Sequence, residues 1–144
     1  MPEKLINLTK EHVRLFSVKD WPKYRETMLP KVTYEEPALA RKVQGVDEVL
    51  RALDVWTIAF PDLKGTVKNV IVQDDMVMAE IQWEGTHNGL LKGPFGEIPA
   101  TGKRGVINAV ELFQFKGEKI VELRHYFDLM TILNQIGVPA LAAR

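Results

Sequence analysis

The change in the spacing of apolar residues near Leu63 is the feature that most constrains the fold of this chain. Before it, apolar side chains recur at the three-to-four-residue spacing of one helix face, and after it they alternate as on a strand. The alternating segments are residues 63–73, 76–87 and 104–127, the last interrupted by a Lys-Gly-Glu hairpin turn. Helices followed by a meandering sheet predict an α+β fold, with an antiparallel sheet folded against the helices.

The helical part contains three expected helices. The first covers the stripe from Leu5 to Phe16, and the second begins after Asp20 as N-cap and ends at Pro30. A strand bounded by prolines is expected over residues 31–38. Residues 45–62 carry acids in the first turn and one apolar stripe, so they predict an amphipathic helix.

Length and composition limit the function classes. A chain of 144 residues fits a single domain over residues 1–144. Nineteen basic residues balance nineteen acidic ones without any dense basic run, which argues against nucleic acid or an anionic membrane as partner. The absence of cysteine excludes disulfides and thiolate chemistry. No signal peptide or membrane span is recognisable, so the expected location is the cytoplasm.

A Gly- and Pro-rich stretch over residues 88–104 separates two of the predicted strands. It is longer than most hairpin loops, and long connections in compact domains are usually functional or disordered. We expect a lid over a binding site.

Alternation divides each strand into two faces. The apolar faces contain only three ionisable residues, which are His87, Glu111 and His125. A few polar groups on an apolar concave wall are typical of a small-molecule pocket, and ionisable groups in clefts often mark functional sites. The alternative for Glu111 and His125 is a hydrogen-bonded core pair. For His87, next to the long loop, a place at the pocket rim and an ordinary exposed histidine are both open.

Aromatic residues are the expected apolar walls of this pocket. Trp83, Phe113 and Phe127 share the apolar faces, and Tyr24 and Trp56 could close the pocket from the helices, although packing alone would explain both. His12 lies on the stripe of the first helix, where a buried, hydrogen-bonded core histidine is expected.

Asp128 lies at the junction between the last strand and a final helix. Its expected main role is to N-cap that helix, while steering His125 is the second option. The sequence Glu84-Gly-Thr-His87 has a metal-ligand spacing, but on a strand its two end side chains point to opposite faces. No metal site is therefore predicted.

The motifs of residues 20–38, 59–64, 85–104, 115–128 and 133–137 together resemble the SnoaL-like polyketide cyclases. Shared features are an H-x-G, a P-x-T-G-K/R turn and a closing motif of the form L-x-Q-L-G. The likeness covers nearly the whole chain and implies the cone-shaped nuclear-transport-factor-2-like fold, in which a curved sheet wraps around N-terminal helices.

The resemblance implies a cofactor-independent aldol ring closure on a polyketide ester. An acid/base residue removes a proton next to a carbonyl and a polar group stabilises the enolate. In the alignment the family's acid/base aspartate falls at His125 and its assisting histidine at Glu111, so the two residue types are exchanged here. A His/Glu pair can still move a proton, because histidine titrates near neutrality and a carboxylate can orient it.

These observations predict a pocket enzyme that uses His125, Glu111 and Asp128 on a hydrophobic carbonyl or ester substrate. His87, Trp83, Phe113, Phe127, Tyr24 and Trp56 are the expected substrate-binding residues. The alternatives are an isomerase or an epoxide or ester hydrolase on the same scaffold, or a non-catalytic small-molecule-binding module. The outer sheet face, with Val110, Leu112 and Tyr126 among its residues, is apolar enough to predict a homodimer.

Overall fold

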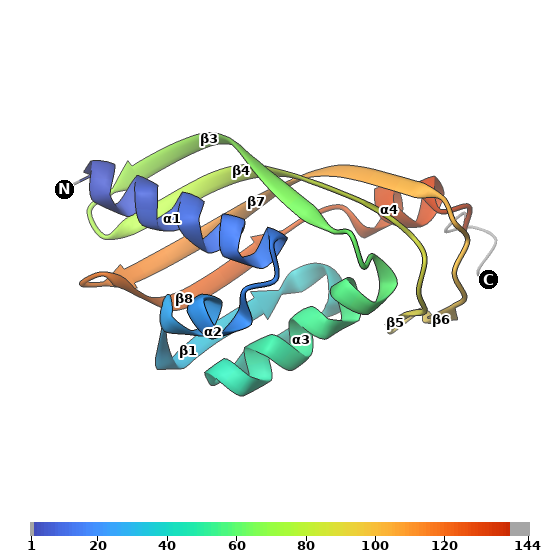
Figure 1. Cartoon of the computed structure of the whole chain (residues 1–144), viewed down its shortest axis with the longest axis horizontal. Coiled ribbons are helices and arrows are strands. Elements are labelled where there is room, and N and C mark those ends of the chain that lie inside the picture. Colours follow the sequence, from blue (N-terminus) through green and yellow to red (C-terminus); the bar gives the residue numbers. More distant parts are fainter. Residues whose placement is uncertain (1, 139–144) are drawn as a thin grey trace.

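A computed structural model describes residues 2–138 of the chain (Figure 1). The helices are α1 (Pro2–Ser17), α2 (Trp21–Glu26), α3 (Val46–Ala59) and α4 (Leu129–Gln135), with a short 3₁₀ helix η1 (Pro37–Leu39). The strands are β1 (Met28–Glu36), β2 (Arg41–Gln44), β3 (Lys64–Gln73), β4 (Met76–Thr86), β5 (Leu91–Gly93), β6 (Gly96–Ile98), β7 (Arg104–Lys116) and β8 (Lys119–Tyr126).

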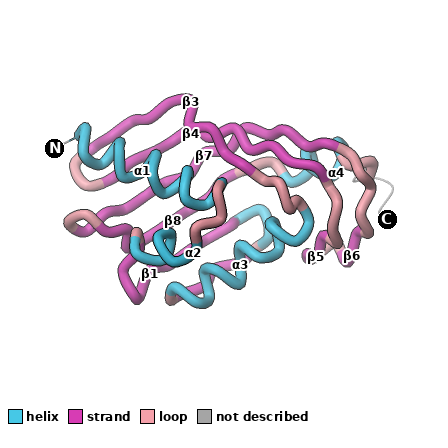
Figure 2. The backbone as a smooth tube through the Cα atoms, in the orientation of Figure 1, coloured by secondary structure: helices cyan, strands magenta, loops and turns pink. Residues whose placement is uncertain are grey.

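Six strands form one sheet in the order β2-β1-β8-β7-β4-β3. Figure 2 shows the sheet curving behind α1, α2 and α3, which lie against one of its faces. The α+β cone expected from the sequence is confirmed, including the tight turn between β7 and β8. The expectation of a purely antiparallel sheet is wrong at one pair, because β1 and β8 run parallel. Parallel neighbours need a long crossover, and here residues 37–118, more than half of the chain, lie between the two strands.

The alternation read from the sequence corresponds to burial in the strands. Along β4 the side chains of Val77, Ala79 and Ile81 are fully buried, whereas Met78 and Glu80 between them are exposed. The buried positions face α1 and the exposed ones form the outer face of the sheet. One face of the sheet therefore builds the core together with the helices.

The predicted end of the second helix at Pro30 is wrong. Helix α2 already ends at Glu26, and Pro30 lies inside β1, which begins at Met28. Proline has no N–H to donate, so strands accept it where the ladder is irregular. The β1–β8 register shifts between Met28 and Thr33, and this shift gives Pro30 such a position.

The segment expected to form a lid contains a short hairpin made of β5 and β6, packed on the end of α3. The Gly89 amide donates to the Ala59 carbonyl at 3.1 Å. A Cβ at Gly89 would lie 1.9 Å from the Ile58 carbonyl oxygen, so only glycine allows this approach. Leu91 is fully buried in the same cluster, which fixes the hairpin on the helix.

Within residues 2–138, no helix has the length and the apolar character that crossing a membrane requires.

Candidate functional site

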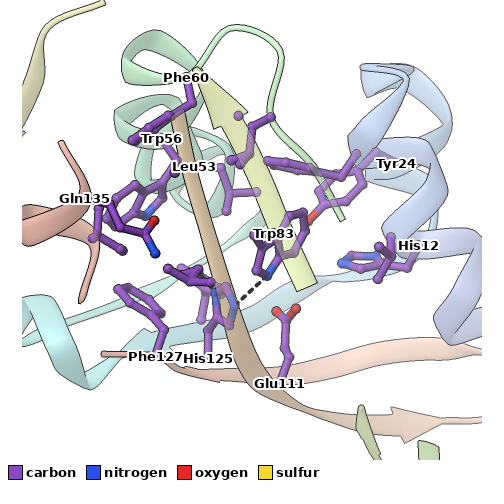
Figure 3. A pocket seen from close by; sticks show the side chains of 18 residues that line it. His12, Tyr24, Leu53, Trp56, Phe60, Trp83, Glu111, His125, Phe127 and Gln135 are labelled. Carbon is purple, nitrogen blue, oxygen red and sulfur yellow. Dashed lines mark hydrogen bonds between the residues drawn. The ribbon is translucent and has the colours of Figure 1, made fainter. Parts of the chain in front are cut away.

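A cavity of about 70 Å³ lies between the inner face of the sheet and the helices (Figure 3). Since one water molecule needs about 10 to 15 Å³ on this scale, the cavity has room for several waters or part of a small ligand. Its lining is mostly aromatic and aliphatic. The polar or ionisable residues among the lining are His12, Tyr24, Tyr34, Trp56, Trp83, Glu111, His125 and Gln135.

Glu111 points from β7 into this cavity (Figure 3). The residue is 5% exposed, and its carboxyl makes no hydrogen bond to any residue between 2 and 138. Burial, and secondarily the negative charge of Glu36, raise the pKa of Glu111 to about 8. At neutral pH the side chain is therefore mostly a protonated carboxylic acid, with a hydrogen to donate into an apolar space.

His125 pairs with Glu111 across β7 and β8 and lines the same cavity. Its Nε2 accepts a hydrogen bond from the Trp83 indole at 3.1 Å, and its Nδ1 lies 3.2 Å from the Tyr34 hydroxyl. That hydroxyl gives its one hydrogen to Glu36, so its oxygen accepts from Nδ1–H of His125. Both ring nitrogens are occupied and the ring is neutral, consistent with burial that lowers the pKa of His125 to about 4.

Glu36 is the fully buried carboxylate behind this wall. It accepts hydrogen bonds from Tyr34 and from the Trp56 indole, each at 2.7 Å, and from the Arg41 guanidinium. Arg41 also donates to the Ala52 carbonyl of α3 at 2.7 Å. The network fixes the orientation of Tyr34 and, through it, that of His125. A buried charge needs such a set of partners.

Glu36, Tyr34 and Arg41 are site residues that were not predicted from the sequence. Alternation along β1 places Tyr34 and Glu36 on the same face as the buried Val32. A charged Glu36 on this apolar face is the sequence feature that could have identified the site.

His12 also lines the cavity and is 2% exposed. The expectation of a buried, hydrogen-bonded histidine is confirmed, because Nδ1 lies 2.8 Å from the Thr27 hydroxyl. The imidazole stacks on Tyr24, with ring centroids 4.3 Å apart. Burial lowers the pKa of His12 to about 3, so the ring is neutral.

Four of the six expected substrate-binding residues line the cavity: Tyr24, Trp56, Trp83 and Phe127. Phe113 is absent from the lining. It is fully buried and makes a T-shaped contact with the His12 ring, with centroids 5.6 Å apart. His12 was not predicted as a site residue, because its position on the apolar stripe of α1 is typical of a core residue.

His87 lies outside the cavity lining, contrary to the expectation that it joins Glu111 and His125. It is fully buried against Phe60, and its Nδ1 interacts with the Thr101 hydroxyl at 2.9 Å. The His87 carbonyl also accepts from the amides of Thr101 and Gly102. β4 ends at Thr86, so His87 belongs to the loop between β4 and β7. Its contacts with Thr101 and Gly102 hold the two ends of that loop together.

Asp128 is the N-cap of α4, as expected. Its Oδ1 accepts from the Met130 amide at 3.0 Å and its Oδ2 from the Thr131 hydroxyl at 2.9 Å. It is not among the residues that line the cavity. At the other end of α4, the Gln135 amide donates to the Val106 carbonyl and accepts from the Val106 amide, both at 2.7 Å, which attaches the helix to β7.

Among residues 2–138, no three His, Asp or Glu side chains come together in a way that could hold a metal ion. The cavity lining contains no lysine or arginine that would recognise a phosphate-bearing cofactor. The groups present fit a neutral, apolar ligand that carries a hydrogen-bonding oxygen.

Helices packed on a curved sheet of six strands define a nuclear-transport-factor-2-like α+β cone. The family model of the SnoaL-like polyketide cyclases matches residues 7–136. The chain therefore belongs to the SnoaL-like polyketide cyclase family. No curated protein sequence matches the chain.

Solved structures show the same fold at low sequence identity. A proposed SnoaL-like polyketide cyclase from Jannaschia sp. CCS1 is 24% identical with a TM-score of 0.79, covering 95% of this chain and 94% of the other. AclR, a proposed hydroxylase from Streptomyces galilaeus, is 24% identical with a TM-score of 0.80, covering 95% and 97%. IdmH, a proposed polyketide cyclase from Streptomyces antibioticus, is 22% identical with a TM-score of 0.80, covering 93% and 99%.

Proposed function

We propose that this protein performs acid/base chemistry on a hydrophobic carbonyl compound, of the enolisation or aldol type found in polyketide ring closure. The observation that carries the proposal is Glu111, a buried carboxyl that faces an aromatic cavity without a hydrogen-bond partner in residues 2–138. A carboxylic acid kept neutral by its surroundings can donate to a carbonyl oxygen and stabilise the charge that develops there in an enolate.

Tyr24 supplies a second donor in this proposal. Its hydroxyl has no hydrogen-bond partner within residues 2–138, and the ring lines the cavity. Burial, and then the charge of Glu111, raise the pKa of Tyr24 well above its usual value, so the phenol keeps its hydrogen. Two neutral donors in an apolar cavity are suited to an oxygen that gains negative charge during the reaction.

The proton-carrying role that the sequence assigned to His125 passes to Glu111 in this proposal. His125 uses Nε2 to accept from Trp83 and Nδ1 to donate to Tyr34, which leaves neither nitrogen for a substrate. Its role is to hold these two aromatic side chains as the wall next to Glu111. Asp128 is assigned to helix capping, because each of its carboxylate oxygens already accepts a hydrogen bond from α4.

Exchange of α-protons tests the proposal without knowledge of the natural substrate. The probe is 2-indanone, a small, flat, uncharged ketone, incubated with the protein in D₂O and followed by proton NMR. We expect catalysed loss of the α-proton signal, and Glu111→Gln should slow it by about 10² to 10⁴-fold, as loss of a general acid does. The matched control is Glu80→Gln on the exposed outer face of β4, which should exchange at the wild-type rate.

A non-catalytic binding module is the second candidate, favoured by the predominance of aromatic lining over polar groups. Trp56 and Trp83 line the cavity, so ligand entry should change tryptophan fluorescence. Saturable quenching by 2-indanone with no exchange above the uncatalysed rate would support this candidate and contradict the catalytic proposal.

We further propose that the chain works as a homodimer through the outer face of its sheet.

A further inference from the structure

His12 has a ring nitrogen that its hydrogen bonds leave free. The Thr27 hydroxyl donates its only hydrogen to the Tyr24 carbonyl at 2.7 Å, so its oxygen must accept from Nδ1–H of His12 at 2.8 Å. The neutral ring has its single hydrogen on Nδ1, and Nε2 therefore carries a lone pair. Nε2 makes no hydrogen bond to any residue between 2 and 138, and the ring, 2% exposed, lines the cavity.

His12 and Glu111 line the same cavity. The His12 ring makes a T-shaped contact with Phe113, which is two residues from Glu111 on the same face of β7. The same ring packs on Tyr24, and the charge of Glu111 contributes, after burial, to raising the pKa of Tyr24. In Figure 3 the Glu111 carboxyl points into the space beside His12. An acceptor nitrogen and a donor carboxyl thus face one apolar space.

We propose that Nε2 of His12 is the catalytic base that removes the proton from the carbon next to the substrate carbonyl, while Glu111 protonates the carbonyl oxygen. The inference rests on the proposed function and adds the base that enolisation requires. Nε2 takes the proton, the C–H electron pair becomes the new C=C bond, and the carbonyl π pair moves to oxygen. That oxygen receives the Glu111 proton. The products are the enol, the His12 imidazolium and the Glu111 carboxylate.

The neighbouring carboxyl explains how a weakly basic histidine can act here. Burial alone disfavours the imidazolium, because a single charge in an apolar cavity is poorly solvated. When Glu111 releases its proton in the same step, a carboxylate forms beside the imidazolium and no net charge is created. Opposite charges in a medium of low dielectric constant attract strongly, so each transfer promotes the other.

The ketone-exchange assay with 2-indanone in D₂O tests this role. We expect His12→Gln to lower the exchange rate by about 10² to 10⁴-fold, the range for loss of a general base. The matched control is His87→Gln, which changes a buried histidine outside the cavity and should leave exchange at the wild-type rate. Circular dichroism and the melting temperature establish that each variant is folded before its rate is compared.

A second measurement does not depend on a folded His12 variant. Nitrogen-15 NMR of the wild-type protein should show His12 protonated on Nδ1, and added phenol, whose O–H can donate, should shift the Nε2 resonance. Methoxybenzene, which lacks that hydrogen, should not. A His12 ring protonated on Nε2, or an Nε2 resonance that ignores phenol, would overturn the inference.

The outcomes separate the inference from the function it rests on. If Glu111→Gln loses exchange and folded His12→Gln keeps the wild-type rate, His12 is not the base but the proposed function stands. If the wild-type protein exchanges no ketone proton, the catalytic proposal and the base both fail, whatever the tautomer of His12.

Discussion

The Tyr34 hydroxyl lies 3.2 Å from Nδ1 of His125 and donates its own hydrogen to Glu36 at 2.7 Å. One oxygen thus joins a buried carboxylate to the histidine and fixes the position of the hydrogen on that ring. Tyr34→Phe removes the acceptor of His125 and one donor of Glu36. We expect the free energy of unfolding to fall by about 1 to 3 kcal/mol, the cost of leaving a buried polar group unpaired. Urea denaturation measures it.

Tyr126→Phe is the matched control, because Tyr126 is 41% exposed on the neighbouring strand. Its removal of a hydroxyl should change stability by less than about 0.5 kcal/mol. Equal stabilities of the two variants would contradict the role assigned to the Tyr34 oxygen.

The pKa of Glu111, raised from 4.5 to about 8, makes stability depend on pH. Between these values the folded protein keeps a proton on Glu111 that the unfolded chain has lost, so the unfolded state binds fewer protons and stability falls as pH rises. The contribution of Glu111 is fully present below pH 4.5 and lost once pH passes 8. Glu111→Gln cannot titrate there.

Urea denaturation of wild type and Glu111→Gln at pH 5, 6, 7 and 8 checks this. The stability of the wild type relative to the variant should decrease steadily across the series, since His12 and His125 are common to both proteins and cancel. A difference that is constant with pH would mean that Glu111 titrates normally.

Arg41 is expected to be essential for stability because it is the cationic partner of the fully buried Glu36. Arg41→Met leaves that carboxylate without its counter-ion and should cost about 3 to 5 kcal/mol. Adding Glu36→Gln should recover part of the loss. The control is Arg51→Met, which breaks an exposed pair with Glu48 and should cost about 0 to 1 kcal/mol. Similar losses for Arg41→Met and Arg51→Met would refute the expectation.

Asp128→Ala removes the N-cap of α4 and should lower stability by about 0.5 to 2 kcal/mol, with the ketone-exchange rate less affected. Asp128→Asn keeps an acceptor for the Met130 amide and should be close to wild type. Thermal denaturation measures the stability of both variants, and the exchange assay measures their ketone-exchange rates. An Asp128→Ala protein of unchanged stability and no exchange would give Asp128 the catalytic role instead.

The outer face of the sheet exposes Met78, Val106, Val110 and Tyr126 on three adjacent strands. An apolar patch of this kind predicts a homodimer. Light scattering at micromolar concentration should give twice the chain mass, and Val110→Lys should shift it to the monomer. Val18→Lys, at an exposed apolar residue on the helical side, should leave the dimer intact. A wild-type monomer at that concentration would rule out the prediction.

Local patterns explain what the sequence could predict. Alternation located β4, β7 and β8 and placed Glu111 and His125 on the inner face, because side-chain direction depends only on position along a strand. The cap at Asp128 is likewise a contact between residues two and three apart. Each of these features is decided within a few residues of chain.

Contacts between distant segments explain what the sequence could not predict. His125 touches Tyr34, 91 residues away, and Trp83, 42 residues away, so the occupation of both its nitrogens is visible only in three dimensions. His12 depends in the same way on Thr27, whose hydroxyl fixes the tautomer. His87 was misplaced because alternation was extended beyond Thr86, where β4 ends.

The place of β8 between β1 and β7 has a consequence for how the protein is made on the ribosome. Until residues 119–126 emerge, the sheet consists of two unjoined halves, β2-β1 and β7-β4-β3, each with an open edge. His125 then bonds to Tyr34 of one half and to Trp83 of the other. Completion of the sheet and assembly of the cavity wall are thus one late event, so a nascent chain lacking its last strand has no finished binding site to expose.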